Sequence, residues 1–393
     1  MQQQAKKLPW QLSEYDKSLV CATYFGFTPI VAPRVTPQDV EEARHCVANE
    51  HFDGVEKAAL IRTYIKENFS ALPHPLALAY KRTGRKSGPS PKREGYSLHF
   101  IGSPSGIAEA ALIRAALSIL SEEGYKNLRL DLNCIGDKES MAIYERELHN
   151  YVKKFGGGLS EPIKESLKED VFNLFRNNHE EMMQFRAAAP SSISFLSASS
   201  RNHFKEVLEF VEALGIEFTL APELIGEKNH SSHTVFCIKS TGLDRELTKD
   251  GLEVLATGYR YSRLGKKMGL RKEVPMAGCS IFLNKHEPKA EKVYKELPRA
   301  KFYLVQLGSE AKKRSLTLLE SLRSNRIPVH HFIGKDKLTA QLTSAEQLRV
   351  SHLIIIGHKE ALDNTATIRN MSTRAQDTIP MCDLPVYLKS IRL

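Results

Sequence analysis

Apolar residues recur at helical spacing in several long segments of the first 300 residues. This spacing predicts helices over residues 11–27, 106–123, 139–155 and 201–214. Alternating apolar and polar positions, with flanking prolines at the first, predict short strands at residues 28–33, 128–132 and 234–238. The segment from 81 to 97 is basic and rich in Gly, Ser and Pro, which predicts a mobile loop.

The hydrophobic pattern changes near Arg299. From there, strands and helices alternate, which predicts a compact α/β domain with a mainly parallel sheet. We therefore expect two domains, residues 1–300 and 301–393, with a helical insertion at about 150–200 in the first. The predicted strands of the second domain are 302–307, 327–332 and 353–356, and its predicted helices are 309–325 and 336–348.

Charge and cysteine usage narrow the class of protein. The 393-residue chain has a net charge of +10, which suits RNA, DNA or an anionic surface and equally suits a well-solvated surface. None of the six cysteines forms a C-x-x-C pair, and no Cys/His cluster has zinc spacing. No apolar run reaches the roughly 20 residues that cross a bilayer, and the N-terminus lacks the apolar core of a signal peptide. We expect a cytoplasmic protein with reduced thiols and no membrane partner.

Motifs of other enzyme classes are missing from the chain. It contains no G-x-x-x-x-G-K-[ST] loop, no H-E-x-x-H and no G-x-S-x-G. His230 and His233 lie three residues apart, but without a third ligand nearby they do not predict a metal site.

Several segments, in order along the chain, resemble the motifs of one enzyme family. Residues 8–35 resemble the first motif of class II aminoacyl-tRNA synthetases, and residues 80–100 resemble the second. Residues 201–238 and 302–393 resemble the histidine-binding stretch and the anticodon-binding domain of histidyl-tRNA synthetase. The resemblance implies an α+β fold with an antiparallel sheet and flanking helices, followed by an α/β anticodon-binding domain. It also implies tRNA as a partner and a homodimer formed through residues 8–35 and the helix from Gly106.

The second motif departs from the family at its charged positions. Lys86 stands where the family has the arginine that holds the α-phosphate of ATP, and a lysine lacks the planar fork of that arginine. Gly88 replaces a glutamate and Phe100 replaces a glutamine, whereas His99 matches the family's histidine. The next acid, Glu109, fits the start of a helix, where carboxylates are favourable.

The histidine-binding stretch and the third motif depart in the same way. Counting back from residues 234–236, the family's catalytic arginine falls on Gly226, its aspartate on Asn229 and its first tyrosine on His230. The family's glutamate falls on Cys237. In the third motif Lys285 replaces the arginine that binds the γ-phosphate.

Two further positions differ by size rather than charge. Phe282 stands where the third motif has a glycine, and Thr257 replaces a glycine of a tight turn. Loss of a single transition-state contact typically costs roughly 10²–10³ in rate. Joint loss of several therefore predicts a catalytically inactive relative, without ATP, Mg²⁺ or other cofactor and with no catalytic residue.

We expect this relative to act by binding tRNA or another structured RNA. Two alternatives stay open: a divergent, active histidine–tRNA ligase that uses ATP and Mg²⁺ through Lys86 and Lys285, and a regulatory subunit of a histidine-pathway enzyme. The anticodon-binding-like domain counts against the second alternative. Candidate RNA-binding residues are the cations of the first helix of that domain and its end: Lys312, Lys313, Arg314, Arg323 and Arg326. A second basic cluster, equally consistent with a solvated loop, is Arg82, Arg85, Lys86, Lys92 and Arg93.

Overall fold

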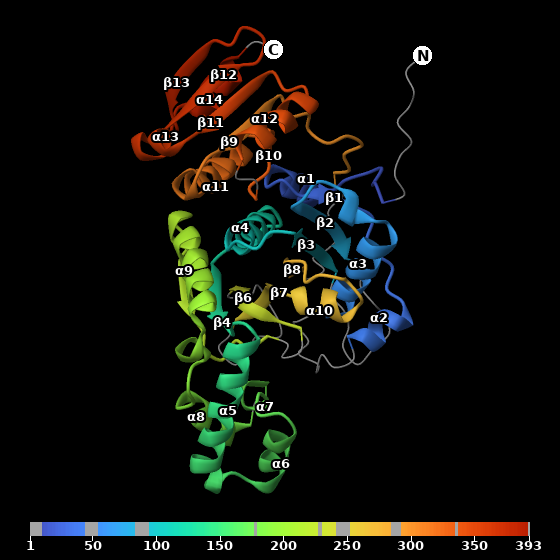
Figure 1. Cartoon of the computed structure of the whole chain (residues 1–393), viewed down its shortest axis with the longest axis vertical. Coiled ribbons are helices and arrows are strands. Elements are labelled where there is room, and N and C mark those ends of the chain that lie inside the picture. Colours follow the sequence, from blue (N-terminus) through green and yellow to red (C-terminus); the bar gives the residue numbers. More distant parts are fainter. Residues whose placement is uncertain are drawn as a thin grey trace.

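The computed structural model contains two β-sheets, each covered by helices (Figure 1). It describes residues 10–43, 54–82, 94–176, 179–226, 230–240, 252–283, 292–334 and 337–391. The first sheet lies in the part of the chain before residue 283, and the second begins at Phe302.

The first sheet has eight strands in the order β1-β2-β3-β8-β7-β6-β4-β5. All pairs from β2 to β4 are antiparallel, and only the two edge strands pair in parallel. This confirms the expected antiparallel sheet with flanking helices. The strands are β1 (Thr28–Pro29), β2 (Leu76–Arg82), β3 (Gly95–Ile101), β4 (Leu128–Cys134), β5 (Phe218–Leu220), β6 (Ser232–Ser240), β7 (Glu253–Arg260) and β8 (Met276–Phe282).

Helices cover both faces of this sheet, and the sheet separates two hydrophobic cores. The first core lies under α1 (Lys17–Tyr24), α4 (Ile107–Glu122) and α9 (Ala198–Ala213). The second core lies on the other face, under α3 (Gly54–Lys66) and α10 (Ser262–Lys267). The short helix α2 (Pro37–Glu42) packs against α3.

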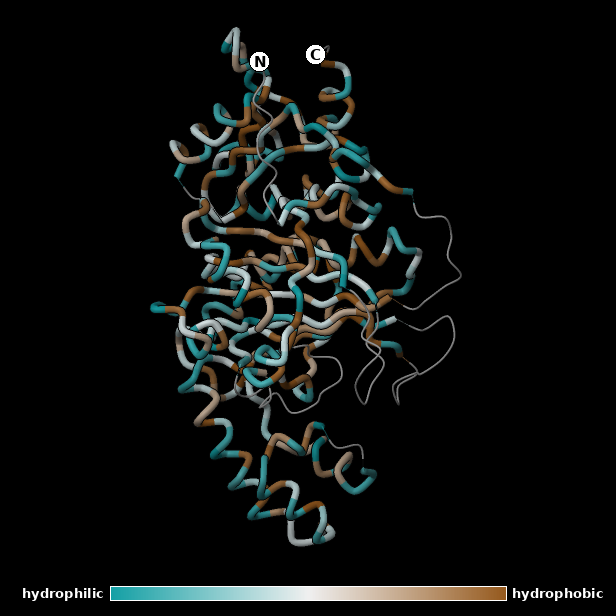
Figure 2. Tube along the Cα trace, turned by 90° about the vertical axis from the view of Figure 1, so that its right-hand side faces the viewer, coloured by the Kyte–Doolittle hydropathy of each residue, from teal (hydrophilic) through white to brown (hydrophobic). Residues whose placement is uncertain are grey.

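An arm of helices projects from the end of β4 away from both sheets (Figure 1), and Figure 2 shows the same projection after a quarter turn. It contains the helical region expected at about residues 150–200. Its elements are α5 (Lys138–Phe155), η2 (Gly156–Gly158), α6 (Glu161–Glu169), α7 (Asn173–Arg176), α8 (Glu180–Ala187) and η3 (Ser192–Phe195). Among the described residues, no helix is both long and apolar enough to span a membrane.

The predicted elements near the N-terminus are shorter in the structure. The helix expected over 11–27 begins only at Lys17, because Asp16 caps it by accepting the Leu19 N–H at 2.9 Å. It ends where Gly26 takes a left-handed backbone conformation, φ +83. The strand expected over 28–33 is reduced to the two residues of β1. The hydrophobic pattern does not predict β2, β3, β5, β7 or β8.

The C-terminal sheet has the order β10-β9-β11-β12-β13. Its first three strands are parallel, as predicted, but β12 and β13 extend it in antiparallel fashion. The parallel part and its two helices agree with the sequence pattern. The elements are β9 (Phe302–Gln306), α11 (Ser309–Ser324), β10 (Val329–His331), α12 (Leu338–Gln347), β11 (His352–Ile356), α13 (His358–Asp363), β12 (Thr365–Asn370), β13 (Gln376–Pro380) and α14 (Leu384–Ser390).

The two domains pack through α11, which lies between its own sheet and α1, α4 and α9 (Figure 1). Three ion pairs between described residues cross this interface, and two of them join Lys313 to Glu209 at 3.2 Å and Arg114 to Glu320 at 2.8 Å. A third joins Arg323 at the end of α11 to Glu122 at the end of α4. Because α4 is enclosed by the sheet and by these helices, 12 of its 16 residues are buried.

Candidate functional site

The segments that resemble the synthetase motifs meet on the sheet face covered by α3. Pairing of β2, β3, β8, β7 and β6 puts side chains from all five strands into cross-strand rows. One row runs through Tyr80, Ser97, Ser280, Thr257 and Cys237. The next runs through Leu78, His99, Gly278, Tyr259 and Val235.

His99 lies at the centre of this face and is 1% exposed. Its Nδ1 is 2.9 Å from the Tyr261 hydroxyl and its Nε2 is 3.3 Å from the Tyr80 hydroxyl, and the Tyr80 ring stacks on it at 5.5 Å. A Cβ on Gly278 would lie 2.5 Å from His99 Nδ1, so only glycine fits below the ring. Burial, followed by the charges of Lys57 and Arg82, lowers the pKa of His99 well below its ordinary value. The imidazole is therefore neutral.

Two buried cations of the chain itself share this face. Lys57, 1% exposed, reaches from α3 and places its Nζ 4.2 Å from the centre of the Tyr259 ring. Arg82, 3% exposed, donates from Nε to Glu56 at 2.7 Å, and its guanidinium lies 4.9 Å from the centre of the Phe282 ring. The Gly, Ser and Pro content of residues 81–97 predicts that Arg82 lies in a loop. The structure instead puts it at the end of β2, inside the protein.

The structure brings together some of the predicted site positions and separates another. His99, Thr257, Cys237 and Phe282 all lie on the α3 face. Phe100 points to the opposite face, because side chains alternate along β3, and packs in the first core with its ring 4.9 Å from that of Phe27. Phe100, which replaces a glutamine of the second motif, therefore does not share the α3 face with His99.

The predicted histidine-site positions lie next to β6. Gly226 and His230 are both buried. A Cβ on Gly226 would lie 2.6 Å from Ser231 Oγ and 3.2 Å from a methyl of Val235. A longer side chain at this position has no room without a shift of the segment. Lys86, Asn229 and Lys285 lie outside the described residues.

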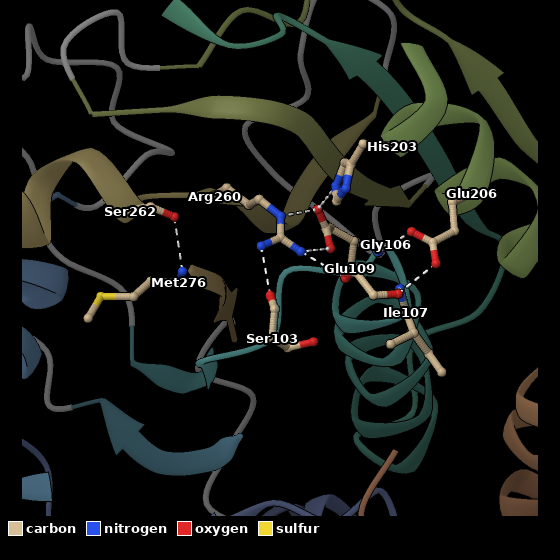
Figure 3. Close-up of polar contacts among 10 residues, drawn as sticks. Ser103, Gly106, Ile107, Glu109, His203, Glu206, Arg260, Ser262 and Met276 are labelled. Atoms are coloured by element: carbon tan, nitrogen blue, oxygen red, sulfur yellow. Dashed lines mark hydrogen bonds and ion pairs between the residues drawn. The ribbon is translucent and has the colours of Figure 1, made fainter. Parts of the chain in front are cut away.

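A buried ionic cluster that the sequence analysis missed joins α4, α9 and β7 (Figure 3). Glu109 is fully buried and accepts from Arg260 Nε at 2.6 Å and Nη2 at 2.7 Å, and from His203 Nε2 at 2.7 Å. Arg260 also donates to the backbone oxygens of Ser103 at 2.9 Å and Ser105 at 2.8 Å. Burial would raise the pKa of Glu109, but the charges of Arg260 and His203 outweigh it and hold this pKa below its ordinary value.

A β-bulge brings a second histidine to this cluster. Ser232 pairs with Arg260 and Val235 with Tyr259, so His233 and Thr234 are extra residues of β6. His233 has a left-handed backbone, φ +54, and its ring lies 4.9 Å from that of His203. Burial, and then the charges of His203 and Arg260, lower its pKa to about 4. No group of three or more His, Cys, Asp or Glu in the described chain is placed to hold a metal ion.

The predicted RNA-binding cations do not form one surface. Lys313 is ion-paired to Glu209 across the domain interface and to Glu310 on its own helix at 2.9 Å. Arg323 is paired to Glu122 across the interface and to Glu320 at 2.7 Å. The other three cations are Lys312, which is partly exposed, and Arg314 and Arg326, which are exposed.

Comparisons with known proteins agree with this architecture. A family model described as "Anticodon binding domain" matches residues 280–391. The chloroplastic histidine–tRNA ligase of Pyropia yezoensis is 26% identical over 337 residues, which cover 83% of this chain and 76% of the relative. The histidine–tRNA ligase of Geobacillus sp. (strain WCH70) is 27% identical over 341 residues, covering 84% and 79%. The crystal structure of apo S. aureus histidyl-tRNA synthetase shares the fold with a TM-score of 0.50 and 20% identity, covering 94% of this chain and 93% of the other.

Proposed function

The chain belongs to the histidyl-tRNA synthetase family, and we propose that it is a pseudoenzyme that binds tRNA or a related structured RNA in the cytoplasm and does not activate histidine. Its anticodon-binding domain supports the RNA-binding half of this proposal. The buried α3 face supports the second half, that the protein does not activate histidine.

The main observation against histidine activation is the position of Lys57 and Arg82. Both are buried on the face where the motif segments meet, and the chain's own Tyr259, Phe282 and Glu56 hold them there. Activation of an amino acid needs cations that are free to meet the developing charge on the α-phosphate. These two cations are already engaged within the protein, which favours a closed core over a nucleotide site.

Two alternative functions have less support. A divergent histidine–tRNA ligase would need Lys86 and Lys285 to replace arginines, and the relatives that this chain matches carry the name of that enzyme. A regulatory subunit of a histidine-pathway enzyme would not need an anticodon-binding domain, so the match over residues 280–391 weighs against it.

RNA binding is tested directly with a tRNA transcript. We expect the full-length protein to retain the transcript in a gel shift at about 50 mM salt and to lose it steeply by about 200 mM, because each neutralised phosphate releases counterions. A variant with Lys313→Glu is unsuitable as a test, since it would place a third carboxylate beside Glu209 and Glu310. Failure of the wild-type protein to bind at low salt would refute the proposal and point to a protein partner.

We also propose that the protein is a homodimer, but through a smaller surface than the sequence suggests. Because α4 is enclosed within the chain, it has little surface to offer a second copy. Exposed residues of the segment 8–35 remain, among them Thr28, Val31 and Arg34, beside the edge strand β1. Light scattering should report a dimer that Val31→Glu dissociates. A wild-type monomer near 44.2 kDa at micromolar concentration would contradict this.

A further inference from the structure

Three arginines of the C-terminal domain occupy backbone positions that normally favour glycine. Arg326, Arg349 and Arg374 have φ values of +57, +51 and +62. Only a few per cent of residues other than glycine adopt such a conformation, and most of those are Asn, Asp or His. Arginine has no local backbone advantage at any of the three positions.

The residue at the left-handed position of a helix end differs between the two domains of this chain. Arg326 follows α11 and Arg349 follows α12, each in a turn where the next residue bonds back across five residues: Ile327 N–H to Leu322 O at 2.9 Å, and Val350 N–H to Ala345 O at 3.4 Å. In the first domain α1, α4, α9 and α10 end in the same turn. There the left-handed position holds Gly26, Gly124, Gly215 and Gly269. Among the described residues, only the C-terminal domain places arginines there.

The topology puts the three arginines at one end of the C-terminal sheet. Arg326 lies just before β10, Arg349 just before β11 and Arg374 just before β13. These strands run in the same direction as β9, which Lys301 precedes. Hydrogen bonds join the loops: Ser351 N–H to Lys301 O at 2.8 Å, and Met371 N–H to Ser351 O at 2.9 Å. The four cations therefore follow the sheet edge from β10 to β13, about 19 Å at roughly 4.8 Å per strand.

These four cations, which we call the basic rim, are all exposed. None has a side-chain hydrogen bond or ion pair with another described residue, in contrast to Lys313 and Arg323 on α11. Lys389 adds a fifth cation, since its Nζ lies 3.1 Å from Oδ1 of Asn325, the residue before Arg326. On α12, the Arg349 N–H donates to the backbone oxygen of Glu346 at 3.0 Å, so one acidic residue lies in the same turn.

We infer that the basic rim is the phosphate-binding surface of this protein and that its ligand is the sugar–phosphate backbone of RNA. The inference rests on the proposed RNA-binding function. It locates the RNA-binding surface away from the cations of α11. A row of unpaired guanidinium and ammonium groups along about 19 Å matches a run of successive phosphates. Arginine at a left-handed position projects from a tight turn with a fixed backbone, which limits the freedom lost when a phosphate binds.

The test replaces the three arginines with the residue that the backbone prefers. The variant Arg326→Gly/Arg349→Gly/Arg374→Gly loses three charges but should keep or slightly raise the melting temperature, because glycine relieves the left-handed positions. Its affinity for a tRNA transcript at about 50 mM salt should fall about 10- to 100-fold. The slope of log K against log salt should fall in magnitude by about 2 to 3.

Two matched variants complete the design. Removal of three exposed cations elsewhere on the chain, Lys295→Ala/Lys337→Ala/Lys359→Ala, takes away the same charge and should leave most of the affinity. Lysine at the three rim positions keeps the charge and should restore most of it. Equal binding by the wild type and the glycine variant would show that the basic rim is not the phosphate-binding surface, although the protein still binds RNA. No binding by the wild type would overturn the proposed function itself.

Discussion

Histidine-dependent exchange of pyrophosphate into ATP is expected to be at least about 10⁴-fold slower than in an intact histidine–tRNA ligase assayed beside this protein. Each transition-state contact to phosphate is worth roughly 10²–10³ in rate, and Lys86, Gly226 and Lys285 replace three arginines of the family pattern. The α3 face adds a second reason, because Lys57 and Arg82 are buried in it and held by aromatic rings and by Glu56.

The control for this assay is a variant of the position that resembles the α-phosphate arginine. If the wild type shows exchange clearly above a blank without enzyme, and Lys86→Ala abolishes it, the protein is a working ligase and the pseudoenzyme proposal is wrong. Exchange that survives Lys86→Ala would instead come from a contaminating synthetase. Calorimetry should give the same answer, with no heat of binding for histidine or for ATP with Mg²⁺.

Much of the fold could be predicted because its longest elements have clear periodicity. The helix from Gly106 and the strand at residues 128–132 appear as α4 and β4, and α11 lies within one residue of the segment predicted at 309–325. Strands β7 and β8 were missed because both faces of each are buried, and the alternation that marks a half-buried strand is absent. The two antiparallel strands of the C-terminal sheet follow the last predicted element and escaped for a different reason. β13 is largely exposed and has no apolar face that would mark it as a strand, whereas β12 alternates buried and partly buried positions that the pattern reading did not assign to a strand.

The candidate site was harder to predict, because its composition depends on which face of a strand each residue occupies. His99 and Phe100 both belong to the segment that resembles the second motif, but alternation along β3 sends them to opposite faces of the sheet. Lys57 gives no sign in the sequence that it is buried, since a lysine on an amphipathic helix is usually solvated. Its burial follows from the position of α3 over β7.

The same limit applies to the charges of the C-terminal domain. In the sequence, a basic run such as Lys312–Arg314 is typical of a nucleic-acid-binding surface. The sequence cannot show that Lys313 and Arg323 form ion pairs with Glu209 and Glu122 of the other domain. The basic rim, in contrast, is scattered over 74 positions from Lys301 to Arg374. Only the strand order brings its members to one edge.

The second large effect concerns stability. Glu109→Gln is expected to lower the free energy of unfolding by about 3–5 kcal/mol, the usual cost of removing one partner from a buried ion pair. The neutral amide leaves the Arg260 guanidinium, 3% exposed, with only backbone oxygens and an amide as partners. It also weakens the contact of His203 on α9, so that α4, α9 and β7 lose a common anchor. Urea denaturation, followed by circular dichroism, measures the change.

A matched exposed pair separates this cost from the general effect of removing a carboxylate. Glu161, 75% exposed, lies 2.9 Å from Lys164, and Glu161→Gln should change stability far less than Glu109→Gln does, because solvent screens an exposed ion pair. The pH dependence of stability tests the role of the Glu109 charge independently. Since the folded pKa of Glu109 is lowered, its contribution is fully present above the ordinary carboxyl range near pH 4.3 and is lost as pH falls below it. Wild type and Glu109→Gln should therefore converge in stability toward low pH, and curves that stay parallel down to pH 3 would show that the charge of Glu109 does not stabilise the fold.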